Sequence, residues 1–356
     1  MGTEGEFDYV RRIDEGCISF VYQVDQSIVV KISNKEDCSN EQFRHEVEMY
    51  KKLSKEKVCA FIVQCFHFAD DGIFLENIRG NAPEIEEPEG NPLIKRTGGC
   101  LAMRINDNHI WNHKTGVVTE VKKLEPLHLR LAWMNDITQA IAFLESVNIA
   151  HGDIRPENVL FDGDRAKLTD FDNAEVYGTP HYGPQPPWGR ELSEGEPNYG
   201  IDGGTGGLMG PRTEQFGLGS MYYYINYGLE PHGDQKLTDT PRNRGVVLNE
   251  LLKAMQLPDL KGEPMIDKLI DQCWHNHFPT IAELSVAIKE LPRSLGLATE
   301  ECEPNNVSSI HSDSDVAANI AAKKAFCEDL EKRGLLSFLN SEMPPYRYGA
   351  NDVNPV

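Results

Sequence analysis

The stretch IAHGDIRPENVLFDGDRAKLTDFDNAE, residues 149–175, is the most informative part of this chain about its fold. Among its polar residues are the carboxylates Asp153 and Asp170 and the amide Asn158, at short separations. Between Asn158 and Asp170, the segments VLF and AKLT flank a turn at 162–165, which is the pattern of a β-hairpin. Because a hairpin returns the chain to its starting point, we expect Asn158 and Asp170 to lie at the same end of it.

These three side chains have the chemistry that phosphoryl transfer requires. Transfer needs a carboxylate near the attacking hydroxyl, and oxygen ligands for Mg²⁺. Asp153 is the candidate to accept the hydroxyl proton, while Asn158 and Asp170 offer an amide oxygen and a carboxylate to the metal. The combination favours a phosphoryl-transfer site over an ordinary loop with surface acids.

Composition limits the other functions that this chain of 356 residues can have. No apolar run approaches the roughly 20 residues of a membrane helix, and the acidic start is not a secretory signal. Eight scattered cysteines without a C-x-x-C pair are typical of reduced thiols, so we expect an intracellular protein, cytoplasmic or nuclear. The net charge of −21 argues against nucleic-acid and membrane binding and allows a basic protein substrate. The oligomeric state stays open.

The first part of the chain, residues 8–105, is rich in short strand-like runs. One amphipathic helix is predicted at 38–55. A polar insertion rich in Pro and Gly, residues 81–99, is expected to form a loop, and the apolar run CLAMRI at 100–105 a buried strand. This part should therefore be mostly a sheet with one helix.

The second part, residues 106–293, is mainly helical in its periodicity. Residues 178–211 are too rich in Gly and Pro for a regular element. The third part, 294–356, begins as an acidic linker and continues as a helix at about 315–333. We expect that helix to pack on the large second part through one apolar face, made of Val316, Ile320, Phe326 and Leu330.

The quoted stretch resembles eukaryotic-type protein kinases. Their pattern H-R-D-x-K-P-x-N is written here HGDIRPEN (151–158), and D-F-G is written DFD (170–172). TEQFGLGSMYYYINYG (213–228) resembles the buried helix of their large lobe, with glutamate for the usual aspartate at its second residue. The resemblance covers about residues 8–293. It implies an α+β, two-lobed fold with a small β-rich N-lobe, a larger helical C-lobe that includes an activation segment at 170–212, and a helical C-terminal tail.

The resemblance also implies roles for individual residues. Asp153 and Arg155 would be catalytic, Asp153 orienting the substrate hydroxyl and Arg155 offsetting charge on the γ-phosphate of ATP. Asn158 and Asp170 would hold Mg²⁺. ATP and Mg²⁺ are therefore the expected nucleotide and metal.

Upstream residues match the nucleotide-binding part of the family pattern. IVVK resembles the strand that bears the nucleotide-binding lysine, here Lys31, and RHEVEMYKKL the helix whose glutamate, Glu46, would pair with it. Gly16 and Val21 belong to the segment that corresponds to the glycine-rich loop. Met103, in the expected strand at 100–105, is assigned to the same ATP site.

Four departures from the family pattern bear on activity. Only Gly16 remains of the three loop glycines, so weaker ATP binding is expected. Gly152 replaces the arginine that holds a phosphorylated activation loop in many kinases, so control by such phosphorylation is not expected. Asp172 replaces a glycine. No A-P-E motif is found in 195–212, so the activation segment must be held in another way.

The sequence thus predicts a protein kinase that transfers the γ-phosphate of ATP to Ser or Thr of a protein, since Pro and Glu after the cation resemble the Ser/Thr type. Two alternatives stay open. A pseudokinase acting as a binding module is compatible with the degenerate glycine loop and Asp172. A small-molecule phosphotransferase is the other, because H-G-D-x-x-x-x-N followed by D-F-D-N-A also resembles antibiotic and choline kinases.

Overall fold

A computed structural model gives the conformation of most of the chain. It describes residues 7, 9–16, 18–34, 37–78, 99–112, 114–200, 205–297 and 313–341. The chain separates into two compact units, each described here by itself. The small unit comprises residues 1–47, 65–77 and 309–356, and the large unit residues 48–64 and 78–308. The loop expected at 81–99 lies almost entirely outside the described residues, and so does the linker before 313.

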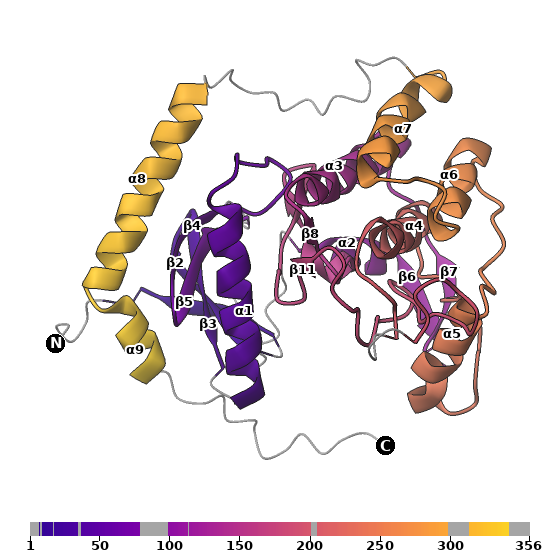
Figure 1. Ribbon diagram of the computed structural model, residues 1–356, viewed down its shortest axis with the longest axis horizontal. Helices are drawn as coiled ribbons and strands as arrows, with labels where there is room; N and C mark the ends of the chain where they lie inside the picture. Colours follow the sequence, from indigo (N-terminus) through magenta and orange to yellow (C-terminus); the bar gives the residue numbers. More distant parts are fainter. Residues whose placement is uncertain are drawn as a thin grey trace. The chain divides into compact units, whose positions relative to one another are not determined.

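The small unit is built on a five-stranded antiparallel sheet of order β1-β2-β3-β5-β4 (Figure 1). Its strands are β1 (Arg11–Glu15), β2 (Ser19–Asp25), β3 (Ile28–Ser33), β4 (Cys65–Ala69) and β5 (Gly72–Glu76). The helix α1 (Asp37–Leu53) follows β3. These elements lie where the sequence predicts strands and one helix.

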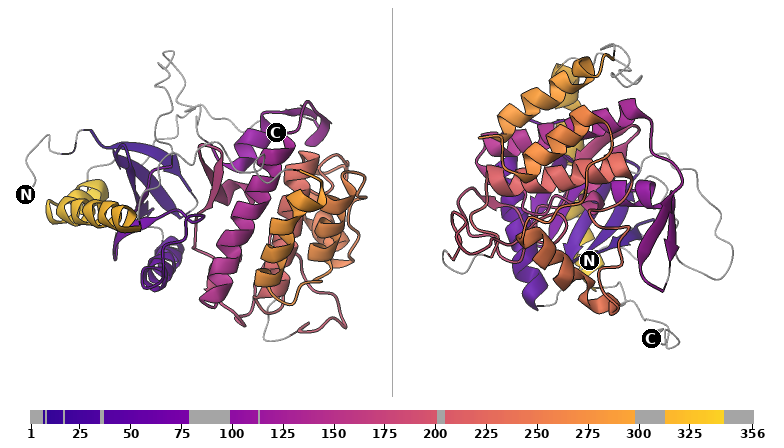
Figure 2. Two further views of the ribbon diagram at one scale, coloured as in Figure 1. Left: turned by 90° about the horizontal axis from the view of Figure 1, so that it is seen from above. Right: turned by 90° about the vertical axis from the view of Figure 1, so that its right-hand side faces the viewer.

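Both faces of this sheet are covered. Successive side chains of a strand point to opposite faces, and β3 is buried at five of its six positions. Val30 and its neighbours two residues away belong to one apolar cluster, whereas Lys31 points to the other face and pairs with Glu46 of α1. Helices therefore flank the sheet on its two sides, as Figures 1 and 2 show.

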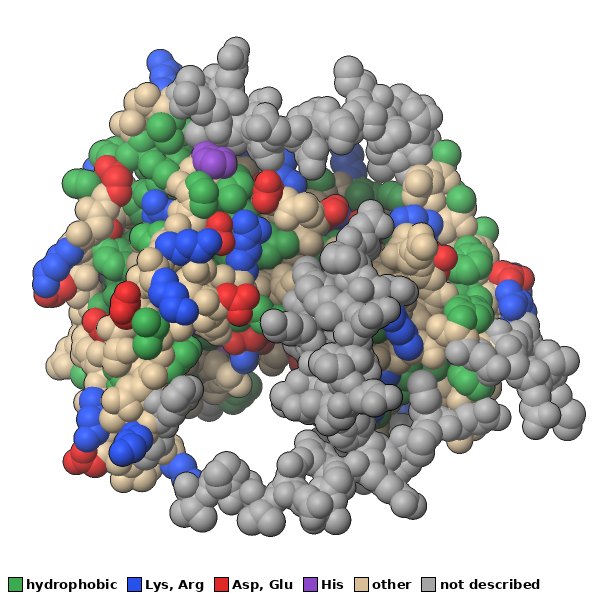
Figure 3. Space-filling model, turned by 180° about the vertical axis from the view of Figure 1, so that it is seen from behind, with side chains coloured by type: hydrophobic (Ala, Val, Ile, Leu, Met, Phe, Trp, Pro, Cys, Tyr) green, Lys and Arg blue, Asp and Glu red, His purple; other side chains and the backbone are tan. Residues whose placement is uncertain are grey.

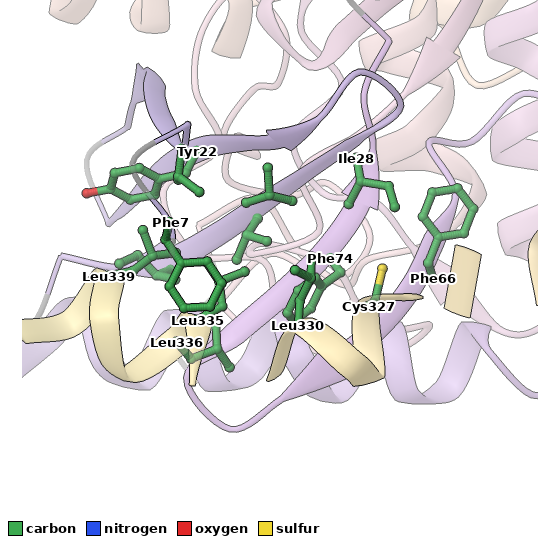
Figure 4. Packing of buried hydrophobic residues seen from close by; sticks show 14 residues of the cluster. Phe7, Tyr22, Ile28, Phe66, Phe74, Cys327, Leu330, Leu335, Leu336 and Leu339 are labelled. Carbon is green, nitrogen blue, oxygen red and sulfur yellow. The ribbon is translucent and has the colours of Figure 1, made fainter. Parts of the chain in front are cut away.

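The second cover is the C-terminal tail, α8 (Asp313–Lys332) and α9 (Leu335–Ser341). Leu330 and Leu335 are fully buried in one cluster with Phe74 of β5 and Tyr22 of β2 (Figure 4). The expectation that the tail helix packs on the large lobe is therefore wrong. Of the face expected for it, Leu330 is buried and Ile320 partly buried, Phe326 is 39% exposed, and the side chain of Val316 lies outside the described residues.

The large unit is mainly helical. Its helices and strands are α2 (Leu101–Asn106), β6 (His109–Asn112), β7 (Val117–Val121), α3 (Leu127–Ser146), β8 (Ile149–Ala150), η1 (Pro156–Asn158), β9 (Val159–Asp162), β10 (Arg165–Leu168), β11 (Glu175–Val176), α4 (Pro211–Tyr227), η2 (Pro241–Asn243), α5 (Arg244–Lys253), α6 (Pro264–Trp274) and α7 (Ile281–Ser294). The long helices α3, α4, α6 and α7 pack against one another (Figure 1). The fold is thus α+β, with a sheet-based small unit and a helical large unit.

Two elements of the large unit differ from the sequence prediction. The run at 100–105 forms the helix α2 rather than a strand, with Leu101, Ala102 and Ile105 buried at helical spacing. A short apolar run fits either element by periodicity, which explains the error. The hairpin of β6 and β7 was not predicted. The boundary between the units also lies nearer residue 78 than the expected 105.

No helix within the described ranges combines the length and the apolar character that crossing a membrane requires. On the face drawn in Figure 3, acidic and basic side chains are interspersed rather than gathered by sign. The negative net charge of the chain therefore does not mean that every part of the surface is negative.

Candidate active site

The predicted hairpin forms and positions the candidate metal ligands. Strands β9 and β10 pair antiparallel with Asp162 opposite Arg165. At the other end of the hairpin, the backbone N–H of Thr169 donates to the carbonyl of Asn158 at 3.0 Å. Asp170, the next residue, therefore lies at the same end as Asn158, as predicted.

Asp153 and Asn158 are joined directly. The side-chain amide of Asn158 donates to the carboxylate Oδ2 and to the backbone carbonyl of Asp153, each at 3.0 Å. These two bonds use the Nδ2 group, so the remaining polar atom of the Asn158 side chain is the acceptor Oδ1. Asn158 thus fixes Asp153 and keeps an oxygen of the kind that binds Mg²⁺.

Burial perturbs the protonation of Asp153. Desolvation disfavours the charged carboxylate and raises the pKa of Asp153 to about 6, although the charge of Arg155 and the bond from Asn158 act in the opposite direction. The negative charge of Asp170 adds to the rise. A carboxylate with such a pKa is largely deprotonated near neutral pH and retains appreciable basicity.

The DFD segment is held by its middle residue. Phe171 is fully buried and packs edge-on against Tyr50, with ring centroids 5.3 Å apart, and against His151 at 5.2 Å. Asp170 has a positive φ of 69°, an uncommon conformation for a residue other than glycine. The side chain of Asp172 is partly buried and accepts a hydrogen bond from Asn173 at 2.7 Å. The residue next to this uncommon backbone conformation is therefore firmly anchored in the core.

A buried carboxylate of α4 holds the start of the segment 151–158, which is called the catalytic loop below. The side chain of Glu214 accepts from the backbone N–H of His151 at 2.8 Å and of Gly152 at 3.3 Å. Burial raises the pKa of Glu214 to about 7. Both N–H groups precede Asp153, so Glu214 orients the backbone from which the candidate base extends.

Gly152 occupies a position where a side chain cannot fit. Its φ is +75°, and a Cβ atom would lie 2.3 Å from Cε of Met209 and 2.6 Å from the carbonyl oxygen of Asn173. An L-residue would be strained there and would also clash with backbone. The family's arginine is therefore excluded at this position by the local packing.

Arg155 lies beside the same carboxylates. Its Nε donates to Glu157 at 2.9 Å, and its Nη1 donates to the side chain of Gln185 at 3.1 Å. Burial would lower the pKa of Arg155, but the neighbouring carboxylates, Asp153 and Asp170 among them, raise it. Arg155 is therefore electrostatically coupled to both aspartates. Gln185 belongs to the activation segment, and sequence reasoning did not single it out.

The small unit contains the expected lysine–glutamate pair. Lys31 Nζ lies 2.9 Å from Oε1 and 2.7 Å from Oε2 of Glu46. Glu46 is completely buried and Lys31 is 7% exposed. Removing either partner would leave an uncompensated buried charge, which costs about 3–5 kcal/mol in other proteins. The pair therefore fixes the lysine ammonium group in one place.

The other three residues assigned to nucleotide binding have different positions. Val21 is directly opposite Lys31 in the pairing of β2 with β3. Gly16 forms a tight turn, its N–H donating to the carbonyl of Ser19 at 2.8 Å. Met103 lies on the helix α2, so the strand on which its assignment rested is absent.

Internal contacts hold the activation segment. Glu196 accepts from both Arg190, at 2.8 Å to Nη1, and the backbone N–H of Ser193 at 2.6 Å. Residues 178–181 and 206–209 exchange four backbone hydrogen bonds of 2.8–2.9 Å. The activation segment lacks an A-P-E motif. It is held instead by an arginine–glutamate pair and a short antiparallel ladder.

Comparison with known proteins identifies the family of the chain. A model of the protein kinase domain matches residues 7–277, and the chain belongs to that family. It is 42% identical to the serine/threonine-protein kinase ppk24, mitochondrial, of Schizosaccharomyces pombe over 60 residues, 17% of this chain and 13% of that protein. It is 26% identical to the protein named "Putative serine/threonine-protein kinase R436" of Acanthamoeba polyphaga mimivirus over 195 residues, 48% of this chain and 64% of that protein.

The chain thus spans less than two thirds of the length of either relative. Membership in the protein kinase family follows from the family match.

Proposed function

We propose that this protein is an active kinase that transfers the γ-phosphate of ATP, with Mg²⁺, to Ser or Thr residues of a protein. The observation that carries the proposal is the Asp153–Asn158 arrangement, with two hydrogen bonds of 3.0 Å that fix a carboxylate of raised pKa. The buried Lys31–Glu46 pair adds a fixed cation of the kind that the same transfer requires against the nucleotide phosphates.

The residues present fit a magnesium ion. Asn158 Oδ1 and the Asp170 carboxylate are hard oxygen ligands, and the amide nitrogen of Asn158 is already used by Asp153. The described residues include no cluster of three or more His, Cys, Asp or Glu that could hold a metal. Mg²⁺ does not need one, because it usually binds through one or two carboxylates, substrate phosphates and water. When bound, the ion would neutralise charge on the phosphates of ATP.

The chain's own residues would then do the following work. Asp153 orients the substrate hydroxyl and accepts its proton. Arg155, coupled electrostatically to Asp153 and Asp170, offsets the charge that develops on the transferred group. Lys31, fixed by Glu46, binds the nucleotide phosphates.

We further propose that activity does not depend on phosphorylation of the activation segment. The Arg190–Glu196 pair and the ladder of residues 178–181 with 206–209 support an ordered segment without a phosphate. Gly152 also leaves no room for the arginine that would read such a phosphate. The protein should therefore be active as synthesised.

The test is transfer of labelled γ-phosphate from Mg·ATP to a generic substrate protein, with Asp153→Asn as the matched variant. Wild-type incorporation should exceed that of the variant at least 100-fold, the scale of general-base catalysis. The wild-type rate should also fall as the pH drops below about 6, because protonation removes the acceptor on Asp153.

Equal incorporation by wild type and Asp153→Asn, with both proteins folded, would refute the proposed activity. The pseudokinase reading would then be favoured if ATP still bound, and Lys31→Met should abolish that binding. Treatment with a phosphatase before the assay tests the regulatory part. A large loss of rate after phosphatase treatment would show that a phosphate group is required.

A further inference from the structure

A pocket in the large unit opens beside the candidate base. It is bounded by the catalytic loop at Asp153, by Gln185, Trp188 and Arg190 of the activation segment, and by Arg212 at the start of α4. None of these residues except Asp153 was given a role by the sequence. The pocket therefore adjoins the place where the acceptor hydroxyl would bind, and its walls decide which neighbouring side chains the substrate can carry.

Two arginines of this pocket lie close enough to repel each other. Burial and the charge of Arg190 lower the pKa of Arg212 to about 10, although the charge of Glu196 acts in the opposite direction. Arg190 is 9% exposed and pairs with Glu196, which compensates one of the two charges. Among the described residues, Arg212 has as its hydrogen-bond acceptor only the carbonyl of Gly206. A guanidinium group has five N–H donors, so most of the donors of Arg212 are left for another acceptor.

The position of Arg212 in its helix makes its positive charge still less favourable. It is the second residue of α4, after Pro211 and the N-cap Gly210. The N-terminus of a helix carries a partial positive charge, which favours anions and disfavours cations. A partly buried arginine at this end, near a second arginine, is electrostatically unfavourable unless an anion binds there.

The remaining acidic groups of the pocket do not supply that anion. Glu214 directs its carboxylate to the backbone N–H groups of His151 and Gly152. Asp153 is bonded by Asn158 and is the candidate acceptor of the substrate proton. His181 also lines the pocket, and burial together with the charge of Arg212 lowers its pKa to about 4, so it is neutral at pH 7.

We propose that this pocket binds an anionic side chain of the substrate, a carboxylate or a phosphate, one to three residues from the phosphorylated Ser or Thr. Arg212 would be the principal ligand, because an arginine fork matches the planar carboxylate and the phosphate oxygens. An extended substrate advances about 3.3 Å per residue, so a side chain close in sequence to the acceptor can reach the adjoining pocket.

This inference rests on the proposed kinase activity and refines it. The net charge of −21 would lead one to expect a basic substrate. Recognition beside the acceptor depends on the local walls of the pocket, however. Arg190 is paired with Glu196, and the two carboxylates of the lining, Asp153 and Glu214, are bonded to Asn158 and to the backbone of residues 151–152. The donors of Arg212 that have no acceptor within the described residues therefore favour an acidic or previously phosphorylated substrate segment.

The test compares labelled peptides of one neutral sequence with a single acceptor serine. The peptides differ only at a residue near the serine, which is Ala, Glu, phosphoserine or Arg, scanned over three positions on each side. Affinity for the full-length protein is measured by fluorescence anisotropy without ATP, and transfer is measured separately. At the best position, Glu or phosphoserine should bind at least tenfold more tightly than Ala, and Arg more weakly than Ala.

Arg212→Gln removes the charge and should reduce the Glu-to-Ala affinity ratio to within about twofold of one. Arg293→Gln is the matched control, because Arg293 lies on the exposed surface of α7 in the same unit, with 83% of its side chain exposed. It should leave the ratio unchanged. If Arg212→Gln does not fold, judged by its thermal melting, the wild-type peptide series decides by itself.

The outcomes separate the two proposals. Equal affinity for the four peptides at every position, or a preference for Arg, would overturn the anion pocket even if transfer occurs. A preference for Glu or phosphoserine without any transfer would support the pocket and refute the kinase activity. A phosphoserine peptide that binds more than tenfold better than the Glu peptide would identify phosphate as the source of the anion.

Discussion

At residue scale, Gly152 shows how the catalytic loop differs from the family pattern. In the sequence, Gly152 stands where many kinases have the arginine that holds a phosphorylated activation loop. Its presence therefore predicts that such phosphorylation does not control the protein. In the structure, the position has a φ of +75° and is closed by Met209 and by the carbonyl of Asn173. The absence of the arginine is therefore built into the packing of the loop, and restoring it would break the loop rather than restore control.

We expect Gly152→Ala to destabilise the protein by about 2–4 kcal/mol, because an unfavourable φ adds to a backbone clash. Gly163→Ala is the matched control, since its φ is also positive, +62°, but nothing lies within 4 Å of its Cβ position. It should cost only about 1 kcal/mol. Urea unfolding of both variants measures the difference. Equal losses of stability would contradict the steric argument.

At the scale of elements, α4 links the core of the large unit to the catalytic loop. Thirteen consecutive residues, Glu214 to Asn226, are buried, so this helix is surrounded by protein on all sides. Its first turn carries two side chains of opposite charge. Glu214 bonds the backbone before Asp153, and Arg212 faces the proposed anion pocket.

The raised pKa of Glu214 predicts a pH dependence of stability. Because burial raises the pKa of Glu214 to about 7 in the folded protein from its ordinary value of 4.5, the folded state binds the proton more tightly between these values. Its contribution to the free energy of unfolding should therefore fall as the pH rises from about 4.5 to about 7, by up to about 3 kcal/mol in total.

Glu214→Gln removes this ionisation while keeping the side-chain length. Urea unfolding at pH 5 and pH 8 should show a smaller loss of stability for this variant than for wild type. Glu290→Gln, at a side chain of α7 that is 62% exposed, should behave as wild type does. A loss in Glu214→Gln as large as that of wild type would show that other groups produce the pH dependence.

At the scale of the whole molecule, the two ends of the chain form one unit. The tail of α8 and α9 completes the core of the N-terminal sheet, with Leu330 fully buried against it. On β4, His67 lies 2.6 Å from Glu331 of α8, and Lys323 of α8 lies over the ring of Phe66. The tail is therefore part of the structure that carries Lys31 rather than an appendage.

Leu330→Ala should destabilise the small unit by about 2–5 kcal/mol, the usual cost of deleting a fully buried leucine side chain. Hydrogen exchange of the amides in β2 and β3 reports this directly. Lys324→Ala, at an exposed position of the same helix, serves as the control. Faster exchange confined to α8, with β2 and β3 unchanged, would show that the sheet is stable without the tail.

Much of the site could be predicted from sequence because its signals are local. The turn at 162–165 brings Asn158 and Asp170 to one end of a hairpin, and the structure confirms this hairpin. The Lys31–Glu46 pair could be predicted because its two residues lie on successive elements of a recognisable pattern. The assignment of Met103 lacks its basis, because a six-residue apolar run does not distinguish a strand from a helix.

The family resemblance, the candidate transfer residues and most helices and strands can be predicted from the amino-acid sequence, because periodicity, turns and short motifs act between residues close in the chain. Three features become visible only after folding: the tail covers the N-terminal sheet, Glu214 holds the catalytic loop, and Arg190 and Arg212 share a pocket. These contacts join segments far apart in sequence. They depend on which apolar faces and charges meet after folding, which no local pattern specifies.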